Sequence, residues 1–266
     1  MAVLIEHEAA LRFGAFIGVF LIMFALEVAQ PLGRGVNRRG RWRANLGLTL
    51  VDAAALRLAG PIAAFGAASY AQAEGVGLLH VIDAPLWFEA CAAFLVLDLA
   101  IYVQHRLVHQ IPILWRLHRV HHTDRQMDVT TGLRFHPAEI VLSMGYKALI
   151  ALALGAPPEI VVLFEIILNA ASLFTHAAVR LPAHAESRIR LLLVTPEMHR
   201  VHHTMGANET KSNYGFFLSI WDRLFGSYNG AAVGQDAPFR FGVEGSEDVP
   251  STSLLWCLRA PFGPKP

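Results

Sequence analysis

Residues 98–122, DLAIYVQHRLVHQIPILWRLHRVHH, place five histidines within 18 positions. A second stretch, MHRVHHT at residues 198–204, repeats the closing H-x2-H-H pattern of the first. On a helix, residues three and four positions apart lie on the same face, so each group presents its imidazoles together. The eight histidines of the two stretches are His105, His109, His118, His121, His122, His199, His202 and His203.

Eight converging imidazoles predict a metal site rather than a set of solvated histidines. Neutral imidazole is the commonest side-chain metal ligand, and burying this many without a cation is costly. One metal takes about four protein ligands, so eight histidines indicate two metals. All-nitrogen ligation suits zinc, copper, iron and nickel alike. The zinc hydrolase pattern H-E-x-x-H is absent, because His7 and Glu8 are not followed by a second histidine at that spacing.

The composition predicts an integral membrane protein. Of the 266 residues, 54% are hydrophobic and 16% are charged, and the mean hydropathy is +0.42. Soluble domains carry about a quarter charged residues. The net charge of +1 gives no support to a nucleic-acid partner, and two cysteines cannot build a disulfide framework. We therefore expect an all-α, membrane-embedded helical bundle.

Apolar runs predict one membrane-embedded domain over residues 1–228. Its spans are expected at about 11–31, 46–70 and 86–104, with a helical hairpin at 140–175 that enters and leaves on one side. A basic connector links the first two spans, and the positive-inside rule places it in the cytoplasm. This connector contains Arg34, Arg38, Arg39, Arg41 and Arg43. The histidine-rich site would then face the cytoplasm, and residues 229–266 would form a loose cytoplasmic tail.

Several further residues are candidates for the site. His176, at the end of the hairpin, is the best candidate for a ninth ligand, and His184 is a weaker one. His136 precedes a proline, so a contact at a helix N-terminus is expected more than ligation. Carboxylates commonly hydrogen-bond metal-bound imidazoles. The candidates for that role are Asp98, Glu197 and Asp222, with Arg106 and Arg223 as alternative partners of the two aspartates.

These motifs together resemble the sterol desaturase and fatty acid hydroxylase superfamily of membrane di-iron oxygenases. The resemblance covers about residues 86–228. It rests on Asp98, Tyr102, His105-Arg106 and His109, on HRVHH at 118–122, on R-x-H-P-x-E at 134–139 and F-x-H-A at 174–177, and on TPEMHRVHH at 195–203, NYG at 213–215 and WDRLFG at 221–226. Some relatives complete a further H-x3-H pair, but here Arg180 stands four residues before His184.

The resemblance implies a cytoplasm-facing site with two iron ions that caps a lipid-filled cavity. The domain at 1–228 would use O2 to oxidise an unactivated C–H bond of a lipid, such as a sterol or fatty acyl chain. The product would be an alcohol, or an alkene if desaturation occurs. Electrons would come from an external ferredoxin- or cytochrome-type partner. The ligands implied are the eight histidines above and His176, and zinc could replace iron in recombinant protein.

Two other classes of function stay open from the sequence. A zinc-dependent lipid hydrolase or lyase of the membrane would use the same histidines without oxidation. A metal transporter would place its ligands near the middle of the bilayer, whereas these lie at the ends of spans. The last residues, 263–266, contain no obvious retrieval signal, which favours a bacterial inner membrane.

Overall fold

The computed structural model describes residues 5–30, 38–59, 63–82, 84–230 and 240–263. Within these ranges the regular elements are helices, with two isolated β-bridges, Leu193–Leu218 and Thr204–Phe241. Five helices or helical stretches are long and apolar enough to cross a membrane. The all-α membrane bundle predicted from the composition is therefore confirmed.

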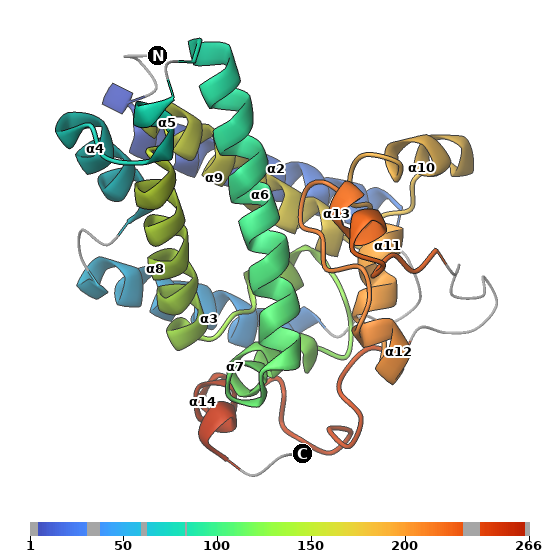
Figure 1. The fold of residues 1–266 in the computed structure, drawn as a ribbon. Coiled ribbons are helices and arrows are strands. Elements are labelled where there is room, and N and C mark those ends of the chain that lie inside the picture. The colour runs from blue at the N-terminus through green and yellow to red at the C-terminus, as the bar shows by residue number, and fades with distance from the viewer. Residues whose placement is uncertain (1–4, 31–37, 60–62, 83, 231–239, 264–266) are drawn as a thin grey trace.

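Five long helices form the bundle (Figure 1). They are α2 (Glu8–Ala29), α3 (Arg38–Ala59), α6 (Leu86–Gln110), α8 (Pro137–Leu154) and α9 (Pro158–His176). Two shorter helices, α4 (Ala64–Glu74) and α5 (Leu78–Val81), follow α3 and pack against α8. A cluster of buried alanine, leucine, isoleucine, valine and phenylalanine side chains joins α4, α6, α8 and α9. Apolar burial of this kind is the main stabilising term in folding.

The predicted hairpin at 140–175 appears as α8 and α9. Gly155 ends α8 with φ of +66°, and Pro158 begins α9 at a position where its missing N–H is not needed. Gly77, before α5, lies directly against the turn of the hairpin at Gly155. A Cβ atom at position 77 would be only 2.2 Å from the Gly155 nitrogen. Glycine at 77 therefore allows the α4–α5 segment to contact the hairpin turn.

Most of the predicted basic connector is helical, because it forms the first turns of α3. Arg38 to Arg43 belong to this helix, and Arg34 lies outside the described residues. Arg41 is buried and forms ion pairs with Asp124 and Asp128. The expectation of a simple basic loop is thus wrong for the described part. The predicted span at 46–70 also crosses residues 60–62, which are not described.

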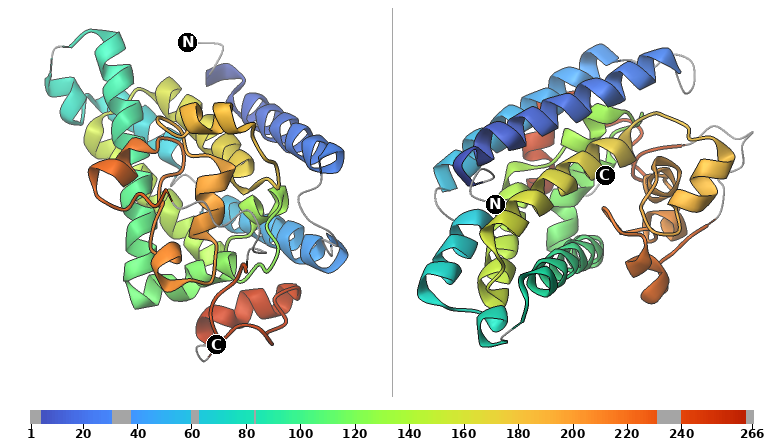
Figure 2. Two further views of the ribbon diagram at one scale, coloured as in Figure 1. Left: turned by 90° about the vertical axis from the view of Figure 1, so that its right-hand side faces the viewer. Right: turned by 90° about the horizontal axis from the view of Figure 1, so that it is seen from above.

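Short helices lie beside the five long ones. They are α7 (Pro112–His122), η1 (Val129–Leu133), α10 (Ala183–Ile189), α11 (Pro196–His202), α12 (Ala207–Thr210) and α13 (Ile220–Leu224). Figure 1 shows α10 to α13 together on one side of the bundle and α4 on the other. Figure 2 shows α10 to α13 from two further sides. Pro112 separates α6 from α7, and Thr195 caps α11 through the Met198 N–H.

The C-terminal segment is packed rather than loose over residues 240–263. Its helix α14 (Leu254–Arg259), followed by η2 (Ala260–Phe262), lies against α3 and α7. Cys257 is fully buried in a cluster with Leu48. The prediction of a loose tail is therefore wrong for these residues, while 231–239 and 264–266 lie outside the described part. Glycine and proline indicate turns, but they do not exclude docking of the segment between them.

Candidate metal centre

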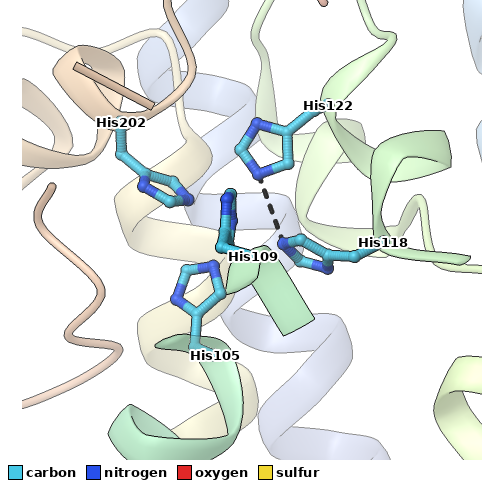
Figure 3. A group of neighbouring side chains, drawn as sticks. All are labelled: His105, His109, His118, His122 and His202. Carbon is cyan, nitrogen blue, oxygen red and sulfur yellow. Dashed lines mark hydrogen bonds between the residues drawn. The ribbon is translucent and has the colours of Figure 1, made fainter. Parts of the chain in front are cut away.

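The structure brings all nine predicted histidines together in two groups. The ligand atoms within each group lie within 4.8 Å of one another. Figure 3 shows the rings of the larger group gathered around a common centre. The first group contains His105, His109, His118, His122 and His202, and the second contains His121, His176, His199 and His203. All except His109 are buried.

Helical periodicity divides the histidines between the groups. On α7, His118 and His122 are four residues apart and belong to the first group, while His121 belongs to the second. The α11 motif does the reverse, because His202 joins the first group. His199 and His203, also four apart, join the second. Each H-x2-H-H motif thus contributes to both groups.

The ring nitrogens approach one another at distances that suit a shared cation. In the first group the Nε2 atoms of His118 and His122 are 3.2 Å apart. In the second, Nε2 of His176 lies 3.0 Å from Nε2 of His121 and 2.9 Å from Nε2 of His199. Two nitrogens bound tetrahedrally to one metal at about 2.1 Å would lie about 3.4 Å apart. The donor set therefore fits a metal ion in each group.

Backbone carbonyls orient several of the imidazoles. The Nδ1–H of His105 donates to Tyr214 O at 2.7 Å, and that of His202 donates to Ser212 O at 2.7 Å. His176 donates to Ser172 O at 2.7 Å. Such bonds place the proton on Nδ1 and leave the Nε2 lone pair for a metal. Nε2 of His105 and Nε2 of His202 are buried without a hydrogen-bond partner among the described residues, as metal-binding atoms would be in the absence of the ion.

Burial keeps these imidazoles neutral. Loss of solvation, with repulsion from neighbouring histidines, lowers the pKa of His122, His199 and His203 well below the usual value. Burial also lowers the pKa of His202, to about 3, although its bond to the Ser212 carbonyl acts in the opposite direction. Near pH 7 all four are therefore unprotonated, the state that binds a metal.

A carboxylate contacts one of the imidazoles, and it is not one of the three predicted. Nδ1–H of His118 donates to Oε1 of Glu139 at 2.6 Å. Glu139 is buried in the first turn of α8. In the sequence Glu139 closes the R-x-H-P-x-E stretch at 134–139, and the pattern alone assigns it no role. The helix start signalled by Pro137 could have indicated a carboxylate held near the site.

Two of the predicted carboxylates have other partners. Oδ2 of Asp98 accepts hydrogen bonds from the Trp221 indole at 2.8 Å and from the Leu218 N–H at 3.2 Å, whereas Arg106 donates to the Tyr102 hydroxyl. Asp98 shares a helical face with His105, but seven residues separate them by about 10 Å along the axis. It therefore ties α6 to α13 and to the residues just before that helix. Glu197 is an ion-pair partner of Arg200, at 2.7 Å.

Asp222 acts on an imidazole through an intervening loop. Its two carboxylate oxygens accept hydrogen bonds from the Tyr214 and Gly215 N–H groups, each at 2.8 Å. The carbonyl of Tyr214 in turn receives the His105 proton. Arg223 lies over the Tyr228 ring, 3.7 Å from its centroid. Asp222 therefore positions the loop that orients His105.

Two further candidate histidines, His136 and His184, belong to neither group. His136 accepts a hydrogen bond from the Ala138 N–H at 3.2 Å, which confirms the expected contact at a helix N-terminus. His184 is exposed on α10. Neither residue contributes to the two groups of nitrogens.

We expect Glu139→Gln to weaken metal binding and turnover by about 10- to 100-fold, the usual cost of losing an outer partner of a metal-bound histidine. The neutral amide can still accept the His118 proton, but it no longer raises the basicity of the imidazole. Metal content after dialysis against graded chelator measures the effect. Leu142→Ala, at an exposed position of the same helix, is the matched control. Equal chelator resistance of the two variants would contradict this role.

A cavity of about 290 Å³ lies beside the first histidine group. It extends between α2, α3, α6, α8 and α9, and His105 and His118 form part of its wall. Most of the other lining side chains are apolar, including Phe16, Phe135 and Leu168. The histidine centre therefore borders a space that suits part of an apolar molecule.

Comparison with known proteins gives lipid-modifying relatives. Ornithine lipid hydroxylase OlsE of Rhizobium tropici is 29% identical over 54% of this chain and 43% of its own length. Human alkylglycerol monooxygenase is 31% identical over 55% of this chain and 31% of its own. A cholesterol 25-hydroxylase-like protein of Danio rerio is 31% identical over 58% and 59%, respectively.

The aligned part spans less than two thirds of each of these relatives. No solved structure shows a significant match to the chain. The fatty acid hydroxylase family, by contrast, matches residues 90–227, which hold every histidine of both groups and the Asp98, Glu139 and Asp222 carboxylates. This match covers more than half of the chain. The protein therefore belongs to the fatty acid hydroxylase family, within the sterol desaturase and fatty acid hydroxylase superfamily.

Proposed function

We propose that this protein is an O2-dependent lipid hydroxylase that uses two iron ions. The observation that carries the proposal is the pair of buried, all-nitrogen histidine groups beside an apolar cavity. The five-histidine group would hold one ion and the four-histidine group the other. Two ferrous ions bound there would supply the activation of O2 that attack on an unactivated C–H bond requires. Imidazole ligation is compatible with iron.

The overall reaction balances with an external reductant. A C–H bond of the lipid is replaced by C–OH, the second oxygen atom leaves as water, and two electrons and two protons are consumed. We propose a ferredoxin- or cytochrome-type electron donor. Hydroxylation is favoured over desaturation because the similar proteins are named hydroxylases and monooxygenases. Burial keeps His122, His199, His202 and His203 neutral, so these ligands can hold metal without taking up these protons.

The chain's own residues position the substrate and protect the site. Apolar side chains such as Phe135 and Leu168 line the cavity and exclude water from the side of His105 and His118. Exclusion of water strengthens electrostatic interactions and limits side reactions. A lipid in the bilayer could enter between the helices that enclose the cavity. Glu139, Tyr214 O and Ser212 O hold imidazoles in the orientation that ligation needs.

We also infer that the histidine centre faces the cytoplasm, as expected for a bacterial inner-membrane enzyme. The inference rests on Arg38, Arg39 and Arg43 at the start of α3, where the neighbouring Arg41 binds Asp124, close after the α7 histidines. Arg39 and Arg43 are exposed there. The proposed electron donor would then bind from the same side.

Elemental analysis tests the proposed centre directly. Protein purified without chelator from iron-supplemented cells is expected to contain about two irons per chain. Incubation with lipid extract, a reducing system and 18O2 should place one labelled oxygen atom in a lipid product. A zinc-loaded protein that converts lipid anaerobically would overturn the proposal in favour of a hydrolase or lyase. One metal or none after anaerobic iron exchange would contradict the two-iron centre.

A further inference from the structure

Asp52 on α3 is a buried carboxylate to which the described part of the chain offers no hydrogen-bond or ion-pair partner. Its side chain is 8% exposed. Its Oδ1 atom is buried without a hydrogen-bond partner among the described residues. The same residue lines the cavity that borders His105 and His118. Burial of a polar group without a hydrogen bond is costly. A bound molecule that donates a hydrogen bond to Asp52 would remove this cost.

The other polar residues of the cavity wall are largely satisfied within the protein. Lys147 donates a hydrogen bond to Glu165 at 2.8 Å, and Glu165 also forms an ion pair with Arg12. Ser143 donates to Gln104 at 3.2 Å. These bonds leave no cation of the wall directed at Asp52. Asp52 therefore differs from Lys147, Glu165 and Ser143, whose bonds join one helix to another.

A second carboxylate oxygen in the same wall is also unsatisfied. Glu139 gives one oxygen to His118, and its other oxygen, Oε2, is buried without a hydrogen-bond partner among the described residues. Glu139 is 6% exposed and lines the same cavity as Asp52. Two free acceptor oxygens therefore belong to one cavity, and neither is provided with a donor by the described part of the chain.

Asp52 shares the wall of one cavity with Glu139, His105 and His118. Asn45, two turns earlier, donates to Thr130 at 3.0 Å. Thr49, one turn on, contacts the carbonyl of Leu133 at 3.4 Å. Asp52 follows about 4.5 Å further along the axis. A group that binds Asp52 and the free oxygen of Glu139 together would lie beside His118, because Glu139 holds that imidazole through its other oxygen.

We propose that Asp52, together with the free oxygen of Glu139, binds a hydrogen-bond donor carried by the lipid substrate. The donor is a hydroxyl or an ammonium group close to the carbon that is oxidised. The proposal rests on the hydroxylase function and adds a class of substrate to it. A plain hydrocarbon chain would leave both oxygens unsatisfied, whereas an alcohol or amine supplies what the cavity lacks.

Three probes of equal chain length test this assignment. They are hexadecan-1-ol, hexadecylamine and 1-methoxyhexadecane, each added as a mole fraction in the micelles of purified, iron-loaded protein under nitrogen. Thermal stabilisation as a function of probe fraction yields an apparent Kd. The alcohol and the amine are expected to bind about tenfold more tightly than the ether, the worth of one hydrogen bond to a carboxylate. The stronger of the two identifies the preferred donor.

Variants of α3 separate recognition from folding. Asp52→Leu should lose most of the preference for the alcohol and the amine over the ether, because Glu139 alone remains as an acceptor. Asp52→Asn keeps an acceptor oxygen but no charge, so it should lose more affinity for the amine than for the alcohol. Ala53→Leu, the control in the same wall, should weaken all probes while keeping the preference. Absence of a preference in the wild type, or an undiminished preference in Asp52→Leu, would overturn the proposal.

Metal content distinguishes this proposal from the one on which it rests. Asp52→Leu should keep about two irons per chain, because Asp52 contacts none of the nine histidines. If the wild type binds the alcohol selectively but forms no 18O-labelled product, the hydroxylase function fails and the donor site stands. If labelled product forms but the three probes bind alike, the donor site fails and the hydroxylase function stands.

Discussion

Replacing His176 with alanine is expected to lower the iron content from about two ions per chain to about one. His176 is the contribution of α9 to the four-histidine group, and its Nε2 lies within 3.0 Å of those of His121 and His199. Without it, three nitrogens remain, and the buried space left by the ring faces the place of the ion. Lipid oxidation should fall by more than about a hundredfold, beyond the loss of an outer partner alone.

In the five-histidine group, we expect the loss of the most exposed member, His109, to leave the iron content unchanged. His109→Ala leaves four imidazoles in that group, so iron content should stay near two while turnover falls. Elemental analysis of both variants measures the difference. His184→Ala and His80→Ala, at exposed positions outside both groups, are the controls and should match the wild type. Two irons and full turnover in His176→Ala would contradict the assignment of the four-histidine group.

The sequence predicts the histidines of this centre more completely than it predicts their grouping. Spacing of three and four residues shows which imidazoles share a helical face. It does not show which face meets which neighbouring helix. That is why His121 and His122, adjacent in the chain, belong to different groups. The partition depends on how α7 packs against α6 and how α11 packs against α9, which is a property of the tertiary packing.

Carboxylates are harder to assign from sequence because many tasks suit them. Asp98 shares a helical face with His105, yet its oxygen satisfies the Trp221 indole and a backbone N–H. Glu139 has no periodic relation to His118 and reaches it only because α8 begins beside α7. Position along one helix predicts contacts within that helix. Contacts between helices require the crossing geometry, which a single sequence does not contain.

In the helical bundle, too, the sequence predicts the local features better than the contacts between distant residues. Hydrophobic runs located α2, α6 and the α8–α9 hairpin, because the length of an apolar run is a local property. The basic residues of α3 and the C-terminal segment were placed less well. Arg41 is compensated by acids that lie more than 80 residues later in the chain, and Cys257 packs against Leu48. Neither partner is visible in the residues around it.

Arg41→Met is expected to destabilise the fold by about 3–5 kcal/mol, the usual cost of removing one partner of a buried ion pair. The Arg41 guanidinium binds both oxygens of Asp124, at 2.5 and 2.8 Å, and Asp128 at 2.8 Å. Burial opposes ionisation of Asp124, but Arg41 and the surrounding donors lower its pKa below the usual value. The pair therefore stabilises the protein at neutral pH, and this stabilisation disappears only when the pH falls through that lowered pKa.

The consequence for the centre follows from the position of Asp124, two residues after His122. Loss of Arg41 leaves two buried carboxylates without their cation, so the end of α7 should separate from α3. The unfolding temperature in detergent should drop on the order of 10 °C, and iron should be lost at lower chelator concentration. Arg43→Met, at an exposed position of the same helix, should change stability by less than about 0.5 kcal/mol. If the two variants unfold at the same temperature, the Arg41–Asp124–Asp128 contacts do not hold the histidine-bearing end of α7 in place.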